Sequence, residues 1–367
     1  MCLWNPRTYM IYRLILSLRN ARYKGGRHSV KAPVPTICVG NITVGGTGKT
    51  PHCEMILRLL LDSARWGSRN IALLSRGYKR RSKGFQEVLY NGSAAMFGDE
   101  PLQIKRKFPP VVTAVCKDRV AGCEALAKDG AELIVLDDAY QYRKLKADLD
   151  IVLTPYDRPV SEDSLLPFGR LRDLPKRLYD ADIVIVSKCP YVLDPEDKSA
   201  MARTLGFDTY DPDTCIATRP SVSRAGRKAG KVDSCLLLFT GINYDRPTPV
   251  FEQTDSRYIY SHKIVLFSGI ADDTPLRNYL SDSYKIVEHL HFPDHHAYTK
   301  ADLRALRKAI KHNPTAAFAT TEKDAQRLRD LPQMPRELLE RLFYFPISVD
   351  FLSERERELF TEKLTTL

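Results

Sequence analysis

The sequence predicts an α/β protein with a doubly wound parallel-sheet domain followed by a smaller α/β domain. Short apolar runs that suit buried strands alternate with segments of helical pattern. At 367 residues the chain also exceeds the length at which a single core usually stops growing. We therefore expect a larger domain at 1–215 and a smaller one at 263–367, joined by a partly stranded linker at 216–262.

The positions of the apolar runs predict the elements of each domain. The larger domain is expected to have strands at 36–39, 71–74, 111–115, 133–136, 151–153 and 183–186, and helices at 48–61, 101–107 and 118–128. The smaller domain is expected to have strands at 263–267, 284–288, 316–319 and 342–346, and helices at 274–280 and 300–311. The linker contains a basic polar stretch at 223–231 and two prolines, Pro247 and Pro249.

A glycine-rich segment follows the first strand and leads into a helix. Gly45, Gly46 and Gly48 leave room for backbone N–H groups to close around phosphate oxygens. Lys49 would reach the β- and γ-phosphates, and Thr50 would hold Mg²⁺. A glycine-rich turn with a chance lysine is the alternative, but strand, glycines, Gly-Lys-Thr and helix in this order favour a P-loop NTPase-like domain. The predicted nucleotide-binding residues are Thr43, Val44, Gly45, Gly46, Thr47, Gly48, Lys49 and Thr50.

An acidic pair, Asp137 and Asp138, follows the apolar strand at 133–136. The carboxyl end of a buried parallel strand is where ligands bind in such sheets. An aspartate pair there can also be a helix cap or a solvated turn, but the phosphate loop favours Mg²⁺ binding. A lysine, Lys188, follows a later strand, but Pro190 stands where guanine-binding proteins place an aspartate, so we predict ATP as the nucleotide.

Composition indicates the cellular compartment and the kinds of partner that the protein binds. The eight cysteines show no CxxC spacing and mostly lie in apolar patterns, which indicates reduced core residues of a cytoplasmic protein. The formal net charge of +11 favours an anionic partner such as nucleic acid, an acidic membrane surface or a phosphorylated substrate. No uninterrupted apolar run approaches the length of about 18 residues needed to span a membrane.

The N-terminal segment, at about 5–24, is apolar with interspersed arginines. This pattern resembles a helix that lies in a membrane interface. Arg13 interrupts the apolar stretch, which argues against a signal peptide. A helix packed on the core of its own domain is the alternative.

Two further segments carry groups that can move protons. Asp99 and Glu100 are adjacent carboxylates before Pro101, which suits the first position of a helix, although Asp99 can also serve as a simple cap. The cluster at 291–298 includes His295, and an imidazole oriented by a carboxylate can assist deprotonation of a hydroxyl near neutral pH. A turn with exposed histidines is the alternative there.

Basic residues recur after the predicted strands, where they can converge on an anionic substrate. Any one of them can also be an ordinary surface residue. They are Arg76, Arg119, Arg143, Arg170 and Arg172.

These motifs together resemble those of the tetraacyldisaccharide 4'-kinases, the lipid A kinases of Gram-negative bacteria. The resemblance follows family order along most of the chain. It rests on the segments at 40–51, 74–78, 98–101, 137–141, 267–271, 292–296 and 321–325. A loop that begins with threonine and continues Gly-Gly-Thr-Gly-Lys-Thr-Pro is characteristic of that family. The segment departs from relatives at Tyr142, where histidine is common.

The resemblance implies transfer of the γ-phosphoryl group of ATP to the 4'-hydroxyl of a tetraacyldisaccharide 1-phosphate lipid, the lipid A precursor. It implies Asp99 and His295 as catalytic residues that lie on opposite domains and meet on closure, together with Lys49. It assigns the metal to Thr50, Glu100, Asp137 and Asp138. The lipid headgroup would contact Arg76, Tyr78, Arg119 and Gln141.

The resemblance also bears on location and partners. It favours a peripheral position on the anionic inner face of the inner membrane, with no nucleic acid and no protein partner implied. The alternative function is a membrane-associated P-loop ATPase switch that does not phosphorylate lipid.

Overall fold

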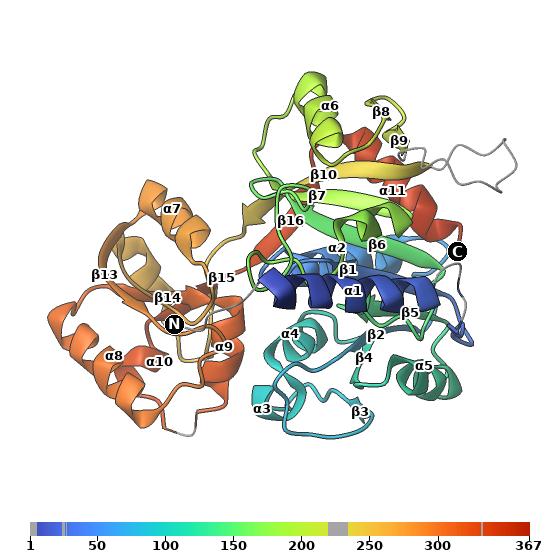
Figure 1. The fold of residues 1–367 in the computed structure, drawn as a ribbon. Coiled ribbons are helices and arrows are strands. Elements are labelled where there is room, and N and C mark those ends of the chain that lie inside the picture. Colours follow the sequence, from blue (N-terminus) through green and yellow to red (C-terminus); the bar gives the residue numbers. More distant parts are fainter. Residues whose placement is uncertain (1–5, 24–25, 27, 219–233, 332) are drawn as a thin grey trace, which may run out of the picture. The chain divides into compact units, whose positions relative to one another are not determined.

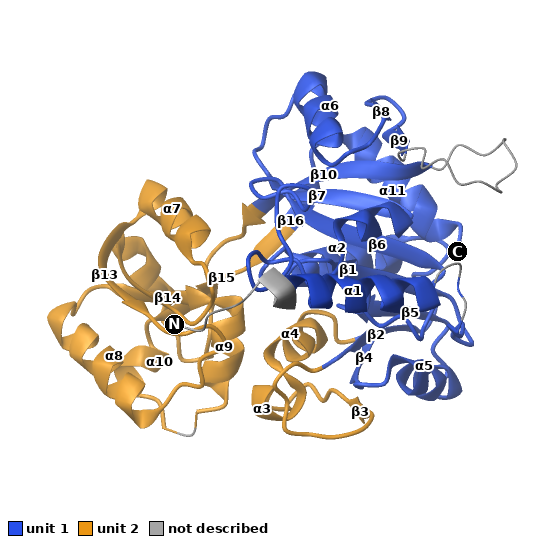
Figure 2. Ribbon diagram, viewed as in Figure 1, with its two compact units in different colours: residues 1–76, 110–242, 349–367 blue, residues 77–109, 243–348 orange. Residues whose placement is uncertain are grey.

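The computed structural model describes residues 6–23, 26, 28–218, 234–331 and 333–367 (Figure 1). The chain divides into two compact units (Figure 2). Unit 1 comprises 1–76, 110–242 and 349–367, and unit 2 comprises 77–109 and 243–348. The predicted basic stretch at 223–231 lies outside the described residues, as does Cys2.

Unit 1 is built on a mostly parallel sheet. Its strands are β1 (Thr36–Asn41), β2 (Ile71–Ser75), β4 (Val112–Val115), β5 (Leu133–Asp137), β6 (Leu149–Pro155), β7 (Ile183–Cys189), β8 (Thr209–Asp211), β9 (Ile216–Thr218) and β10 (Ser234–Tyr244). They lie in the order β4-β2-β5-β1-β6-β7-β10-β9-β8. Pairing is parallel from β4 to β10, and β9 is antiparallel to both of its neighbours.

The central strand β1 is buried along its whole length, as expected for a parallel strand that is covered on both faces. The helices of unit 1 are α1 (Pro6–Arg22), α2 (Lys49–Asp62), α5 (Arg119–Lys128), the 3₁₀ helix η2 (Pro175–Asp180), α6 (Pro195–Thr204) and α11 (Glu354–Thr365). The C-terminal α11 begins with a capping box formed by Ser353 and Glu356. The indole Nε1 of Trp66 donates to the Leu364 carbonyl at 3.2 Å, which joins α11 to unit 1.

Unit 2 has a five-stranded sheet in the order β11-β15-β14-β12-β13. The strands are β11 (Thr248–Pro249), β12 (Lys263–Ser268), β13 (Lys285–His291), β14 (Ala317–Thr321) and β15 (Leu342–Phe345), and all pairs except β11 with β15 are parallel. The helices that lie between these strands in sequence are η3 (Ser256–Ser261), α7 (Thr274–Ser283), α8 (Lys300–His312), α9 (Glu322–Arg329) and α10 (Arg336–Leu339).

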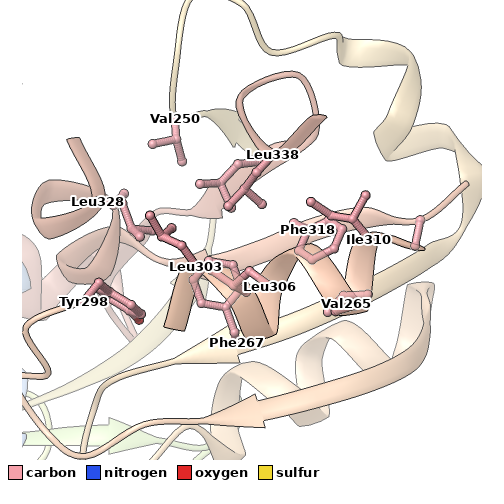
Figure 3. Packing of buried hydrophobic residues seen from close by; sticks show 14 residues of the cluster. Val250, Val265, Phe267, Tyr298, Leu303, Leu306, Ile310, Phe318, Leu328 and Leu338 are labelled. Atoms are coloured by element: carbon pink, nitrogen blue, oxygen red, sulfur yellow. The ribbon is translucent and has the colours of Figure 1, made fainter. Parts of the chain in front are cut away.

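Two apolar cores cover the two faces of this sheet. On one face, Val265, Phe267 and Phe318 pack against side chains of α8, α9 and α10, and Figure 3 shows this cluster. On the other face, Ile264 and Leu266 pack with residues of α7. Alternate residues of β12 therefore serve different cores, as strand geometry requires.

The segment at 77–109 leaves unit 1 after β2 and belongs to unit 2. It carries β3 (Gln86–Glu87), α3 (Ala94–Phe97) and α4 (Asp99–Lys107). Charged side chains join α4 to α9, since Lys107 Nζ pairs with Glu322 at 2.8 Å and Arg106 donates to Gln326. These pairs explain why the units differ from the contiguous division into 1–215, 216–262 and 263–367.

Two other differences from that division follow from sheet pairing. Strand β10 extends the sheet of unit 1, although it lies in the predicted linker. Strand β16 (Ile347–Phe351) pairs with β10, and the chain then returns to unit 1 as α11. The predicted α/β class is confirmed, and the ten predicted strands all occur within a few residues of their expected positions.

Candidate active site

The phosphate loop connects β1 to α2 in unit 1. Helix α2 begins at Lys49, after Gly48 in the left-handed conformation with φ of 86°. Gly45 also has a positive φ, 103°, and a Cβ at Gly45 or Gly46 would meet no atom within 4 Å. The backbone amides of this open loop and of the helix N-terminus that follows it can both donate to phosphate oxygens, so the arrangement is suited to binding phosphate.

Side chains within the loop hold its shape. The Asn41 amide, at the end of β1, donates to Thr43 Oγ1 at 3.2 Å and to Thr47 Oγ1 at 2.8 Å. The Ser187 hydroxyl donates to the Thr47 carbonyl at 2.9 Å. Thr43 and Thr47 are therefore bound internally through their hydroxyls, so the side chains of these two predicted nucleotide-binding residues stabilise the loop.

Lys49, Asp138 and Arg172 form a charged group beside the loop. Lys49 Nζ lies 3.9 Å from Asp138 Oδ1, and Arg172 Nη1 donates to Asp138 Oδ2 at 3.3 Å. Burial alone would raise the pKa of Asp138, but the positive charges of Lys49 and Arg172 bring it below its ordinary value. The Asp138 side chain remains one third exposed, so this ionised carboxylate is accessible.

Asp137 has a different environment although it is adjacent in sequence. It is 2% exposed, and its Oδ2 accepts from the Ser75 hydroxyl at 3.0 Å. The Cys53 thiol lies 3.7 Å from its Oδ1. Of the predicted acidic pair, Asp138 is therefore the member beside Lys49, and Asp137 is the buried one.

The structure places the predicted substrate residues of unit 1 in unlike environments. Arg76 is exposed just after β2. Arg119 is 2% exposed and donates to the carbonyls of Cys116 at 2.6 Å and Asp137 at 3.4 Å. The Gln141 amide donates to the Asn41 carbonyl. Arg119 and Gln141 therefore support the loop and the acidic strand end through backbone contacts.

A second charged cluster lies in unit 2 and is centred on Asp99, the first residue of α4. Asp99 is 6% exposed. Arg327 Nε donates to its Oδ2 at 3.1 Å, and His295 Nδ1 lies 3.4 Å from the same oxygen. Burial opposes ionisation, but His295, Arg327 and Lys323 together bring the pKa of Asp99 well below its usual range. The carboxylate is therefore ionised at neutral pH.

Arg327 links this carboxylate to the sheet of unit 2. Its Nη1 donates to Asp324 Oδ1 at 2.8 Å and to the Gly269 carbonyl at 3.0 Å. Asp324 also accepts from the Gly269 amide at 2.9 Å. The arginine is thus held between two aspartates and one loop carbonyl, in a geometry that fixes Asp99.

His295 is held in an unusual backbone conformation. Its φ is 57°, which is uncommon for a residue with a side chain, and its amide donates to the Gly269 carbonyl at 3.0 Å. The Tyr78 ring centroid lies 5.3 Å from that of the imidazole. Asp99 and His295 both belong to unit 2. The expectation that they lie on opposite domains is therefore wrong, because the inserted segment carries Asp99 into unit 2.

Glu100 is the one predicted metal residue in unit 2, and Lys323 Nζ donates to its Oε1 at 2.5 Å. Thr50, Asp137 and Asp138 belong to unit 1.

Sequence reasoning missed Arg327, which forms the ion pair with Asp99. The segment at 321–325, which carries part of the family resemblance, ends two residues before Arg327. A usable signal was the helical i, i+3 spacing of Asp324 and Arg327, which places an acid and a base on one helix face.

A glycine loop before a helix, with Lys49 beside an accessible aspartate at a neighbouring strand end, defines a P-loop nucleotide-binding protein. The model of the Tetraacyldisaccharide-1-P 4'-kinase family matches residues 7–366. The chain therefore belongs to the tetraacyldisaccharide 4'-kinase family, and it is a lipid kinase.

Individual relatives agree with this membership. The Tetraacyldisaccharide 4'-kinase of Phocaeicola vulgatus is 37% identical, over 99% of this chain and 94% of that protein. The Flavobacterium johnsoniae protein of the same name is 36% identical, over 95% and 92%. The crystal structure of LpxK from Aquifex aeolicus in complex with ATP matches with a TM-score of 0.68 and 27% identity, covering 98% of both chains.

Proposed function

We propose that this protein transfers the γ-phosphoryl group of ATP to the 4'-hydroxyl of a tetraacyldisaccharide 1-phosphate lipid in lipid A biosynthesis. The family membership supports the reaction, and the single structural observation that carries it is the phosphate loop with Lys49 beside Asp138. Phosphoryl transfer depends mainly on positioning and on stabilisation of negative charge, which this loop can supply.

Lys49 and Arg172 are two cations beside Asp138 that can serve the phosphates. Lys49 begins α2, so its ammonium and the first amides of that helix can contact the β- and γ-phosphates. Arg172 already holds Asp138 and also donates to Asn41 Oδ1. It thereby couples the loop to the acidic residue.

The donor set of unit 1 fits Mg²⁺, which prefers oxygen ligands. Asp138 offers an ionised, accessible carboxylate, and Thr50 lies in the first turn of α2. Asp137 would support the site indirectly, because its two carboxylate oxygens already contact the Ser75 hydroxyl and the Cys53 thiol. Mg²⁺ supplies neutralisation of phosphate charge. Glu100 would join this set only after exchange of its contact with Lys323.

His295 is the base in this proposal, and Asp99 orients it. A carboxylate with a strongly lowered pKa is a weak proton acceptor, so Asp99 is poorly suited to remove a proton itself. Asp99 Oδ2 and Arg327 Nη2 lie 3.4 Å and 3.3 Å from His295 Nδ1. In the proposed tautomer Nδ1 carries the hydrogen and donates to Asp99, which stabilises the imidazolium, and Arg327 bonds only to the carboxylate. Nε2 would then take the proton of the 4'-hydroxyl. Arg327 keeps Asp99 ionised throughout.

The lipid headgroup is assigned to exposed residues. Arg76 and Tyr78 are both exposed, and the Tyr78 ring lies beside the His295 imidazole in a tilted arrangement. Arg119 and Gln141 would act by holding the loop, in view of their backbone contacts.

Helix α1 is proposed to lie on the anionic inner face of the inner membrane. Its apolar side chains Met10, Ile11, Leu14, Ile15 and Leu18 are each more than half exposed and recur at helical spacing. The opposite side is anchored in unit 1, where Arg19 pairs with Asp173 at 3.0 Å and Tyr12 donates to the Arg172 carbonyl at 3.3 Å. No helix among the described residues is long and apolar enough to cross a membrane.

The membrane proposal is tested with vesicles that contain anionic lipid. The double variant Leu14→Glu/Leu18→Glu should bind roughly tenfold more weakly or worse, because it removes two large apolar side chains from the interface. Val192→Glu, at a residue that is 83% exposed elsewhere in unit 1, is the matched control. Equal binding by all three proteins would reject the role of α1.

The reaction is tested by transfer of labelled γ-phosphate from ATP to a detergent-solubilised tetraacyldisaccharide 1-phosphate. Lys49→Ala should lower transfer by about 10²–10³-fold, as for loss of one charge-stabilising group. Lys128→Ala, at an exposed residue in the last turn of α5, should leave it unchanged. Release of free phosphate without labelled lipid would instead indicate an ATPase.

A further inference from the structure

Three potential metal ligands meet in unit 2 outside the residues assigned to phosphoryl transfer. They are Asp273, just before α7, and His289 and His291 on β13. One donor atom from each lies within 4.8 Å of the others. Asp273 Oδ2 lies 2.9 Å from His289 Nε2 and 3.5 Å from His291 Nδ1.

An irregularity in β13 creates this grouping. Ile286 is paired with Ile264, but the next residue of β12, Val265, is paired with Glu288, so Val287 is an extra residue in β13. Without the bulge, alternation would place His289 and His291 on the same face as Val287, which packs into the α8 core.

The shift moves both histidines to the α7 face of the sheet. His289 is paired with Leu266, which packs in the α7 core, and His291 is paired with Ser268 two residues later. Asp273 immediately precedes α7, the helix that packs on that same face. Bulges commonly re-aim side chains next to functional sites, and this one brings two imidazoles to one carboxylate.

The surroundings of these three side chains resemble those of known metal sites. The buried Ser268 hydroxyl donates to Asp273, as outer groups do when they orient a ligating carboxylate. Exposure rises from 7% for the Asp273 side chain to 25% for His289 and 53% for His291. The three side chains are therefore anchored at the buried Asp273 and reachable from solvent at His291.

We propose that Asp273, His289 and His291 bind one divalent transition-metal ion of the Zn²⁺ class. Two imidazoles and one carboxylate form a common three-ligand set for such ions, with a further position open to water. Mg²⁺ and Ca²⁺ are disfavoured here, because they prefer oxygen ligands. The site is separate from the Mg²⁺ residues proposed in unit 1.

The position of the site indicates what the ion would do. β13 is one of the two edge strands of the unit 2 sheet, and His291 is its last residue. The Phe292 amide donates to the Ser268 carbonyl at 2.8 Å, and the loop continues to His295. An ion at this place fastens the end of the edge strand to α7, and so stabilises the start of the loop that carries His295.

The experiment uses the full chain, freed of metal with a chelator and then titrated with Zn²⁺ against a competing indicator. We expect one equivalent bound tightly, with Co²⁺ giving the visible absorption of a low-symmetry site. His291→Ala should abolish tight binding, and it should fold because this side chain is half exposed. His312→Ala, at an exposed residue in the last turn of α8, should bind as wild type does.

Two further measurements separate this site from adventitious binding. Ser268→Ala should weaken Zn²⁺ binding by roughly 10–100-fold while the ligands remain, because it removes the hydroxyl that orients Asp273. Hydrogen exchange at the end of β13 should slow on addition of Zn²⁺ in wild type only. The proposal is overturned if no equivalent binds, or if the His289→Ala/His291→Ala variant binds Zn²⁺ as wild type does.

Discussion

Two of the adjacent acidic pairs in this protein, Asp137-Asp138 in unit 1 and Asp99-Glu100 in unit 2, look alike in sequence but have different surroundings. In each pair one aspartate is bound by an arginine, Arg172 or Arg327. The Asp138 side chain is 33% exposed, whereas that of Asp99 is 8% exposed. The Asp138 carboxylate can therefore be reached by a metal ion from solvent, whereas that of Asp99 is enclosed and held by the ion pair with Arg327. This difference supports the proposed roles, ligand binding for Asp138 and orientation of His295 for Asp99.

The largest expected effect separates these roles by kinetics. His295→Ala should lower kcat for lipid phosphorylation by about 10²–10⁴-fold through loss of the base, while ATP affinity is retained. Asp138→Asn should weaken binding of ATP with Mg²⁺ as well as turnover. The measurements are kcat, KM for lipid, and ATP binding by calorimetry. His312→Ala is the control, and reduced ATP affinity in His295→Ala would break the distinction.

The next effect concerns stability and the buried pair of unit 2. Arg327→Met should destabilise unit 2 by about 3–5 kcal/mol, because it leaves the Asp99 carboxylate buried without its main cation. Hydrogen exchange in α4 and α9 reports this change locally. Arg336→Met, which removes the exposed pair with Glu340, should cost about 0.5 kcal/mol or less. Similar losses in the two variants would mean that burial of the Asp99 pair carries no special weight.

A buried histidine gives unit 1 a pH dependence of its own. His52 is fully buried, and its Nδ1 lies 2.7 Å from the Gly48 carbonyl, while burial lowers its pKa to about 4. The unfolded chain binds this proton below about pH 6.5. Stability should therefore fall by about 3 kcal/mol as pH falls from about 6.5 to about 4.

Replacement of the imidazole isolates this contribution. His52→Gln should flatten that part of the stability profile, measured by urea unfolding at several pH values. Burial raises the pKa of Asp150 to about 7, so protonation of Asp150 increases stability as pH falls. This effect opposes that of His52 but is the same in wild type and variant. His312→Gln should keep the wild-type slope. An unchanged slope in His52→Gln would contradict the assignment.

The smallest effect concerns the backbone of the phosphate loop. Gly48→Ala should destabilise unit 1 by about 1–2 kcal/mol, because its φ of 86° is unfavourable for a residue with a Cβ. Gly46→Ala is the matched control, since its φ is ordinary and its Cβ would meet nothing within 4 Å. Thermal unfolding should show a lower Tm for the first variant only. Equal Tm values would show that the loop relaxes without cost.

The sequence allowed correct prediction of features that depend on neighbours along the chain. The strand, glycines, Lys49 and following helix are contiguous, and backbone conformation and hydrophobic periodicity act over such short ranges. The ten predicted strands lie within a few residues of their expected positions for the same reason, whereas the short strands β3, β8, β9 and β11 and the strand β16 were not predicted. Strand β10 was missed as part of the large sheet, because pairing with β7 is not visible in its own residues.

The predicted site was less complete where it depended on distant residues. Asp99 and Arg327 are separated by 228 positions and Asp138 and Arg172 by 34, so no local pattern announces either pair. The location of Asp99 in unit 2 also depends on the inserted segment at 77–109. Its attachment arises from ion pairs between α4 and α9, which only the folded chain brings into contact.

By itself, the sequence determined the α/β class and the phosphate loop with its lysine. The tertiary structure decided which carboxylate is accessible, which arginine holds it and which face of β13 presents His289 and His291. The physical reason is range. Local backbone and hydrophobic patterns are written in neighbouring residues, whereas burial, ion pairing and strand register depend on segments that meet only after folding.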